Sequence, residues 1–138
     1  MSEIESLGEA LGAKALIEDV GVAPIDVVDV GTTVPEAAAE LGKLLLAEPA
    51  KDLIKTGTVP SLYSAAQKLD RPSADADERN NLGCAWALLA YSEPRADYWP
   101  RALAALDASK DSAKTDAQRQ RAEGNRMHVA IARSAGGQ

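Results

Sequence analysis

The chain has 138 residues, 46% of them hydrophobic but none of them Phe, and it carries a net charge of −6. This length suffices for one domain with a core of its own. A single cysteine, Cys84, cannot form an intramolecular disulfide, and no Cys/His cluster has the spacing of a metal site. We therefore expect a cytoplasmic domain that needs no metal or other cofactor.

Hydropathy and charge argue against two further classes of partner. No apolar run approaches the roughly 18 residues that a membrane span needs, and residues 1–9 are acidic where a secretory signal would be basic. An acidic protein also repels phosphate backbones, so nucleic-acid binding is disfavoured. The exception is a basic group that predicts either a solvated helix face or a nucleic-acid contact: Arg119, Arg121, Arg126 and Arg133.

The amino-terminal residues, 1–33, are expected to form an arm outside the main domain. Residues 2–20 place Ile4, Leu7 and Leu11 on one stripe at helical spacing, which predicts an amphipathic helix. The Val-rich residues 22–31 are typical of an extended connector. The arm is either a cap on the first helical hairpin or an element that docks on a partner or on a second copy of the chain.

Helical patterns fill residues 34–138, beginning with a unit over residues 34–70. Pro35 suits a first helical turn, where its missing N–H would have been unpaired in any case. Three helices are expected in this unit: residues 36–48 before Pro49, residues 50–56 before Gly57, and residues 60–69.

The second unit, residues 75–111, has clear helix-start signals. Asp75 and Glu78 have the spacing of a capping box, which predicts a helix over residues 76–91. Asp97 is the expected N-cap of a return helix that runs to about Lys110. A last helix is predicted over residues 116–135, with Gln118 completing a second capping box. Because no second helix follows it, we expect this terminal helix to present a polar outer face.

A fixed step connects these units, because Gly42, Gly83 and Gly124 lie 41 residues apart. Periods of this size are typical of stacked helical repeats. We therefore predict an all-α array of stacked helical hairpins in which the three glycines are equivalent. An array unrelated to any repeat family would show the same period.

The second unit resembles the tetratricopeptide repeat, a right-handed stack of helical hairpins. Residues 81–86, Asn-Leu-Gly-Cys-Ala-Trp, and the return helix that follows match the family's conserved columns at five positions: Leu82, Gly83, Trp86, Ala102 and Leu106. The family repeats at about 34 residues. The seven additional residues of this chain fit the loop over residues 92–97.

The resemblance implies a protein-binding adaptor, because the first helices of such hairpins line a concave groove that takes peptides. Carried onto this chain, the groove-facing positions are Lys43, Asn80, Cys84, Arg121, Asn125 and His128. Arg121 and Asn125 lie one helical turn apart and are expected to share a carboxylate or a peptide carbonyl of the partner. The columns that would complete a carboxylate clamp are not evidently filled.

Catalysis is the competing interpretation, and it depends on Cys84 and His128. Both follow the aligned glycines closely, so a thiolate–imidazole pair is conceivable. No acidic residue orients the histidine in the sequence, and Cys belongs to the residue types most often buried. We therefore expect Cys84 to be a packing residue and the protein not to be an enzyme.

Overall fold

The computed structural model describes residues 35–93 and 97–135, and every secondary-structure element within them is a helix. The predicted helix over residues 2–20 and the connector over residues 22–31 lie outside the described residues. The six helices are α1 (Pro35–Leu41), α2 (Lys51–Thr56), α3 (Val59–Leu69), α4 (Ala76–Ser92), α5 (Tyr98–Ser112) and α6 (Asp116–Ala135). The all-α prediction is confirmed for this part of the chain.

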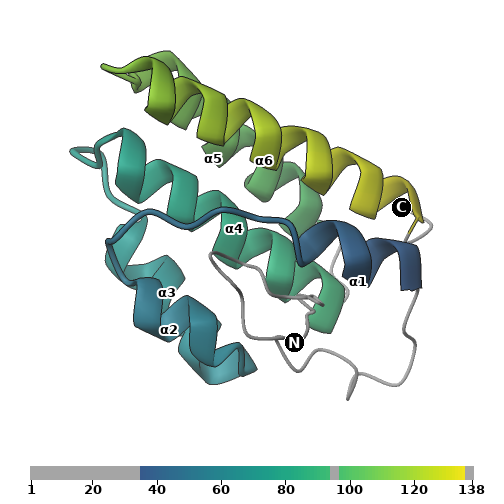
Figure 1. Cartoon of the computed structure of the whole chain (residues 1–138). Coiled ribbons are helices and arrows are strands. Elements are labelled where there is room, and N and C mark those ends of the chain that lie inside the picture. Colours follow the sequence, from purple (N-terminus) through teal and green to yellow (C-terminus); the bar gives the residue numbers. More distant parts are fainter. Residues whose placement is uncertain (1–34, 94–96, 136–138) are drawn as a thin grey trace.

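Helix α4 lies at the centre of the domain and packs against α3 on one side and α5 on another. Helix α6 lies beside α5 and also contacts α1 (Figure 1). The core is aliphatic, as the absence of Phe requires. Its largest fully buried side chains are Leu41, Leu44, Ile54, Leu62, Leu88, Leu89 and Leu106.

Two predicted capping boxes are confirmed. The Asp75 carboxylate accepts the Glu78 N–H at 2.9 Å, and the Glu78 carboxylate accepts the Asp75 N–H at 2.9 Å. At α6, Thr115 Oγ1 accepts the Gln118 N–H at 3.1 Å, and Gln118 Oε1 accepts the Thr115 N–H at 3.2 Å. Each pair satisfies backbone donors that a helix start leaves without partners. Asp97 stands at the N-cap of α5, but its carboxylate makes no capping bond.

The prediction for the first unit is wrong between residues 42 and 48. Helix α1 ends at Leu41, and residues 42–50, which we call the bridging segment, are not helical. The segment crosses in front of α4 on its way to α2 (Figure 1). Gly42 is therefore not on a helix, so its predicted equivalence to Gly83 and Gly124 fails. Tertiary contacts to the backbone, described below, outweigh the helix propensity of its leucines.

The glycines at the other two positions are helical but have different surroundings. A methyl group on Gly83 would lie 2.5 Å from Cγ of Leu106 and 3.0 Å from the carbonyl oxygen of Ala102, both on α5. A methyl group on Gly124 would meet no atom within 4 Å. Gly83 thus allows α4 and α5 to approach closely, whereas Gly124 lies on an open surface.

These surroundings predict opposite effects of the same substitution. Gly124→Ala should raise the free energy of unfolding by about 0.5–1 kcal/mol, because alanine loses less backbone entropy in a helix. Gly83→Ala should lower it by about 1–3 kcal/mol, because the added methyl group overpacks the fully buried Leu106. Urea denaturation of both variants measures the difference. If Gly83→Ala raised the free energy of unfolding as Gly124→Ala does, Gly83 would not be a close-packing position.

The outer face of the terminal helix α6, predicted to be polar, carries two exposed apolar side chains. Met127 and Ile131 on this helix are 61% and 44% exposed, and Leu45 of the bridging segment is 47% exposed. These are the exposed large hydrophobic side chains of the described residues. No helix in the described part of the chain is both long enough and apolar enough to cross a bilayer.

Candidate functional site: an asparagine-lined face that binds an extended segment

Asn81 of α4 binds the backbone of the bridging segment in the way that a neighbouring β-strand would. Its Oδ1 accepts the Ala47 N–H at 2.8 Å, and its Nδ2 donates to the Ala47 carbonyl at 2.8 Å. Nδ2 also donates to the carbonyl of Pro49 at 2.6 Å. The Asn81 side chain is fully buried, so these bonds replace those that water would make.

Asn125 of α6 repeats this arrangement two residues earlier in the segment. Its Oδ1 accepts the Leu45 N–H at 2.8 Å, and its Nδ2 donates to the Leu45 carbonyl at 2.8 Å. Asn80 of α4 donates to the same carbonyl at 3.0 Å. Two helices thus bind alternate residues of one extended backbone, and both the N–H and the C=O of each residue are engaged.

The three amides also bind one another, which fixes their orientation. Asn125 donates to Oδ1 of Asn80 at 2.8 Å, and Asn80 donates to Oδ1 of Asn81 at 3.0 Å. None of the three residues is more than 1% exposed. We call Asn80, Asn81 and Asn125 the asparagine cluster. A buried network in which each amide has its partners is rigid, and it presents a preformed surface to an extended chain.

Among the residues predicted from the sequence, Asn80 and Asn125 are brought together on this face. Arg121 is one turn from Asn125 but binds a different atom, because its Nη1 lies 3.1 Å from Oδ1 of Asp77 on α4. In the described chain the two side chains therefore share no acceptor. Their use by a partner remains a prediction.

His128 and Lys43 meet at a carboxylate beside the bridging segment. Nδ1 of His128 lies 2.7 Å from one oxygen of Glu40, and Nζ of Lys43 lies 3.1 Å from the other. Partial burial raises the pKa of Glu40, but the hydrogen bonds and charges of His128 and Lys43 together outweigh it, so the pKa is lowered. Glu40 is therefore held as a carboxylate that ties α1 to α6.

Cys84 lies beside the asparagine cluster and has no exposed surface. Its Sγ is 3.6 Å from Nδ2 of Asn125. Burial raises the pKa of the thiol far above its usual range, and the nearby charge of Arg121 only partly opposes this effect. Because His128 binds Glu40, the described contacts do not join the cysteine to the histidine.

The burial of Cys84 predicts that its thiol reacts slowly with alkylating reagents. Alkylation by iodoacetamide at neutral pH should be at least about a hundredfold slower in the native protein than in the urea-unfolded protein, because the thiolate is scarce and the sulfur is covered. Mass spectrometry of the native and the urea-unfolded protein measures the two rates. Rapid alkylation of the native protein would restore the catalytic interpretation of this residue.

The basic group near the C-terminus is largely charge-paired. Arg126 contacts Asp107 of α5 at 2.6 Å, Arg119 pairs with Asp116, and Arg121 pairs with Asp77. Pairing of this kind is typical of a solvated helix face and leaves little excess positive charge for phosphate groups.

Asn81 and the bridging segment were not predicted from the sequence as parts of one site. One signal was available, because Asn80 and Asn81 are adjacent within a helix, where asparagine is disfavoured. Two such residues in a helix interior indicate bonds to something other than the helix itself. The sequence carries no comparable signal for what they bind.

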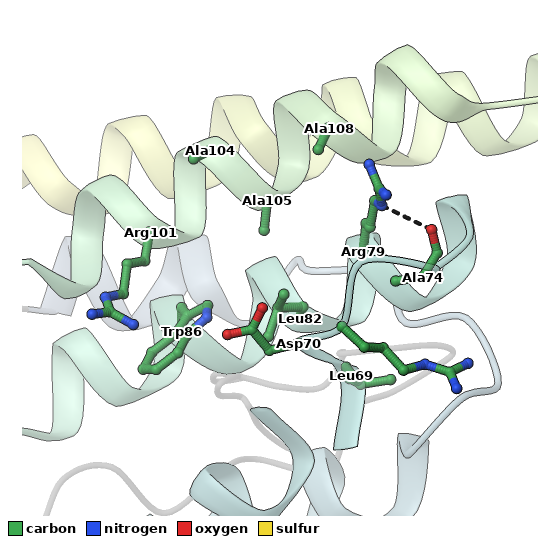
Figure 2. A pocket seen from close by; sticks show the side chains of 11 residues that line it. Leu69, Asp70, Ala74, Arg79, Leu82, Trp86, Arg101, Ala104, Ala105 and Ala108 are labelled. Atoms are coloured by element: carbon green, nitrogen blue, oxygen red, sulfur yellow. Dashed lines mark hydrogen bonds between the residues drawn. The ribbon is translucent and has the colours of Figure 1, made fainter. Parts of the chain in front are cut away.

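A separate pocket of about 310 Å³ lies on the other side of α4 (Figure 2). Leu82 and Trp86 line it from α4, and three alanines line it from α5. Arg101 lies over the indole of Trp86 at 5.0 Å from the ring centroid, and Arg79 donates to the carbonyl of Ala74 at 2.9 Å. Small residues on α5 leave this space open.

Comparisons with family models, with curated proteins and with solved structures found no match. The resemblance to tetratricopeptide repeats therefore depends on the sequence columns alone.

Proposed function

We propose that this protein is a protein-binding module whose asparagine cluster binds an extended segment of a partner protein in place of its own bridging segment. The supporting observation is the set of paired amide bonds to Leu45 and Ala47. Such bonds recognise an extended backbone whatever its side chains are, as in recognition by strand addition. The bridging segment is then the resident ligand of the groove.

Exchange needs a partner that replaces both the backbone bonds of the segment and the packing of its buried side chains. Leu44 is its one fully buried leucine, while the side chain of Leu45 is about half exposed. A partner segment needs an apolar residue at the Leu44 position, a small residue at the Ala47 position and an extended backbone between them. Arg121 and His128 of α6 stay beside the asparagine cluster when the segment is exchanged, and they can contact acidic side chains of the partner. Lys43 belongs to the bridging segment and leaves with it.

Stacking of the helices as tetratricopeptide-like hairpins is part of the same proposal. Gly83 faces Ala102 and Leu106 of α5, in the columns where the tetratricopeptide family has its own closely approaching helices. With this equivalence, α4 and α6 are first helices of successive hairpins, and the asparagine cluster is on their concave side. The proposed adaptor role follows from that arrangement.

The test opens the groove and supplies the segment as a separate peptide. Ala47→Pro removes the N–H that Asn81 accepts, which weakens the internal contact without altering the cluster. A fluorescent peptide with the sequence of residues 42–50 should bind this full-length variant at least about tenfold more tightly than it binds the original protein, whose own segment competes at high effective concentration. Fluorescence anisotropy measures both affinities.

Glu48→Ala is the matched control, because the Glu48 side chain is 91% exposed in the same segment and pairs with Lys51 at 3.6 Å. This control should bind the peptide as weakly as the original protein. Equal and negligible binding by all three proteins, with Ala47→Pro still folded by circular dichroism, would contradict a groove that accepts a separate segment.

A further inference from the structure

We propose that α6 carries a second docking face, formed by Ala117, Gly124, Met127 and Ile131, and that this face binds an amphipathic helix of a partner protein. These four residues are spaced by seven, three and four positions, so they form one stripe along the helix. The proposal does not depend on exchange of the bridging segment, because the stripe is not part of the asparagine cluster.

The domain itself contains an occupied example of such a face, on α4. Residues 41 positions earlier than the stripe include Ala76, Gly83 and Trp86, and all three contact α5. Ser109 of α5 donates to the carbonyl of Ala76 at 2.7 Å, and Gly83 faces Leu106. The ring of Trp86 lies 5.2 Å from that of Tyr98 between centroids.

On α6, the corresponding positions have no covering helix among the described residues. Ala117 is exposed, a methyl group on Gly124 would meet no atom within 4 Å, and Met127 is 61% exposed. Ile131, which corresponds to the buried Ala90, is 44% exposed. A stripe with a glycine at its centre and large apolar residues beside it is the surface that α4 uses to hold a helix.

The occupied example also defines the chemistry of the partner. Besides Ser109, α5 contributes Tyr98, Ala102 and Leu106 to this contact, an aromatic, a small and a branched residue spaced by four. The branched residue fits over the glycine, and the small residue lets the helices approach. A flexible Met127 in place of Trp86 makes favourable contacts with an aromatic ring. The partner is therefore a helix with aromatic, small and leucine residues at i, i+4 and i+8.

The probe is a fluorescent peptide with the sequence of residues 97–112, which carries these three residues on one face. It should bind the full-length protein. Gly124→Leu should weaken that binding by at least about tenfold, because the added leucine fills the space over residue 124 in which the leucine of the peptide would pack. The open surroundings of Gly124 allow the variant to fold. Arg119→Leu, which adds the same side chain to an exposed position outside the stripe, should leave the affinity unchanged.

Oxidation of Met127 by hydrogen peroxide supplies a second readout, which uses the original protein and does not depend on the folding of a variant. The rate should be fast in the free protein and fall on saturation with the peptide. Three results would overturn the proposal. The first is that the original protein does not bind the peptide. The second is that Met127 is protected in the free full-length chain, which would make another part of the chain the occupant of the stripe. The third is a dimer in sedimentation that Met127→Asp abolishes, which would make a second copy of the chain the occupant.

Discussion

Replacing Asn81 with alanine is expected to lower the free energy of unfolding by about 2–4 kcal/mol, the sum expected when several buried backbone groups lose their partners. The amide of Asn81 is the partner of the Ala47 N–H and of the carbonyls of Ala47 and Pro49. Alanine leaves these groups either unpaired or exposed by local detachment of the segment. Chemical denaturation followed by circular dichroism measures the loss.

Arg121→Ala is the control for this prediction. Arg121 contacts Asp77 at 3.1 Å, and both side chains are about one-third exposed, so the loss should be at most about 1 kcal/mol. Asn125→Ala should resemble Asn81→Ala and not Arg121→Ala, because Asn125 is buried and binds both the N–H and the carbonyl of Leu45. A loss below 1 kcal/mol for Asn81→Ala would mean that the segment contributes little to stability.

Replacing Leu106 with alanine is expected to lower the free energy of unfolding by about 2–5 kcal/mol, the range for a leucine deleted from a core. Leu106 has no exposed surface and lies directly over Gly83. The same change makes room for a methyl group on α4. On the Leu106→Ala background, Gly83→Ala should therefore become neutral or stabilising, where alone it destabilises.

A double-mutant cycle measures this coupling, and the two substitutions should differ from additivity by at least about 1 kcal/mol. Gly124→Ala serves as the reference, because Gly124 has open surroundings and should add to Leu106→Ala without coupling. Strict additivity of Gly83→Ala and Leu106→Ala would contradict the close approach of α4 and α5 at this position.

The helices with strong local signals were predictable from the sequence. The helix over residues 76–91 begins with the capping box of Asp75 and Glu78, and the observed α4 differs from the prediction by one residue at its end. The terminal helix begins with the Thr115–Gln118 pair, as predicted, and α6 is helical up to Ala135, the last described residue. In both cases the determinants lie within one turn of the helix start, so no distant contact is needed to define them.

The bridging segment was not predictable, because its determinants are distant in sequence. Residues 43–47 are rich in leucine, and leucine favours a helix locally. The bonds that keep this backbone extended come from Asn81, 34 residues after Ala47, and from Asn125, 80 residues after Leu45. Nothing in the sequence near either asparagine indicates which backbone groups it binds.

The candidate site was predictable in part for the same reason. Asn80 and Asn125 were identified as groove-facing through the family resemblance, and the structure places both on the face shared by α4 and α6. The chain's own segment as occupant was not anticipated. The exposure of Met127 and Ile131 was also missed, because a stripe on a terminal helix has the same sequence pattern whether or not another helix covers it.

Hydrogen exchange of individual backbone amides, followed by NMR on the full-length protein, tests the central claim most directly. The N–H groups of Leu45 and Ala47 donate to buried asparagines, whereas those of Leu46 and Glu48 make no bond within the described residues. We predict that Leu45 and Ala47 exchange at least about a hundredfold more slowly than Leu46 and Glu48. Fast exchange at all four positions would show that the asparagine cluster does not hold the segment in solution.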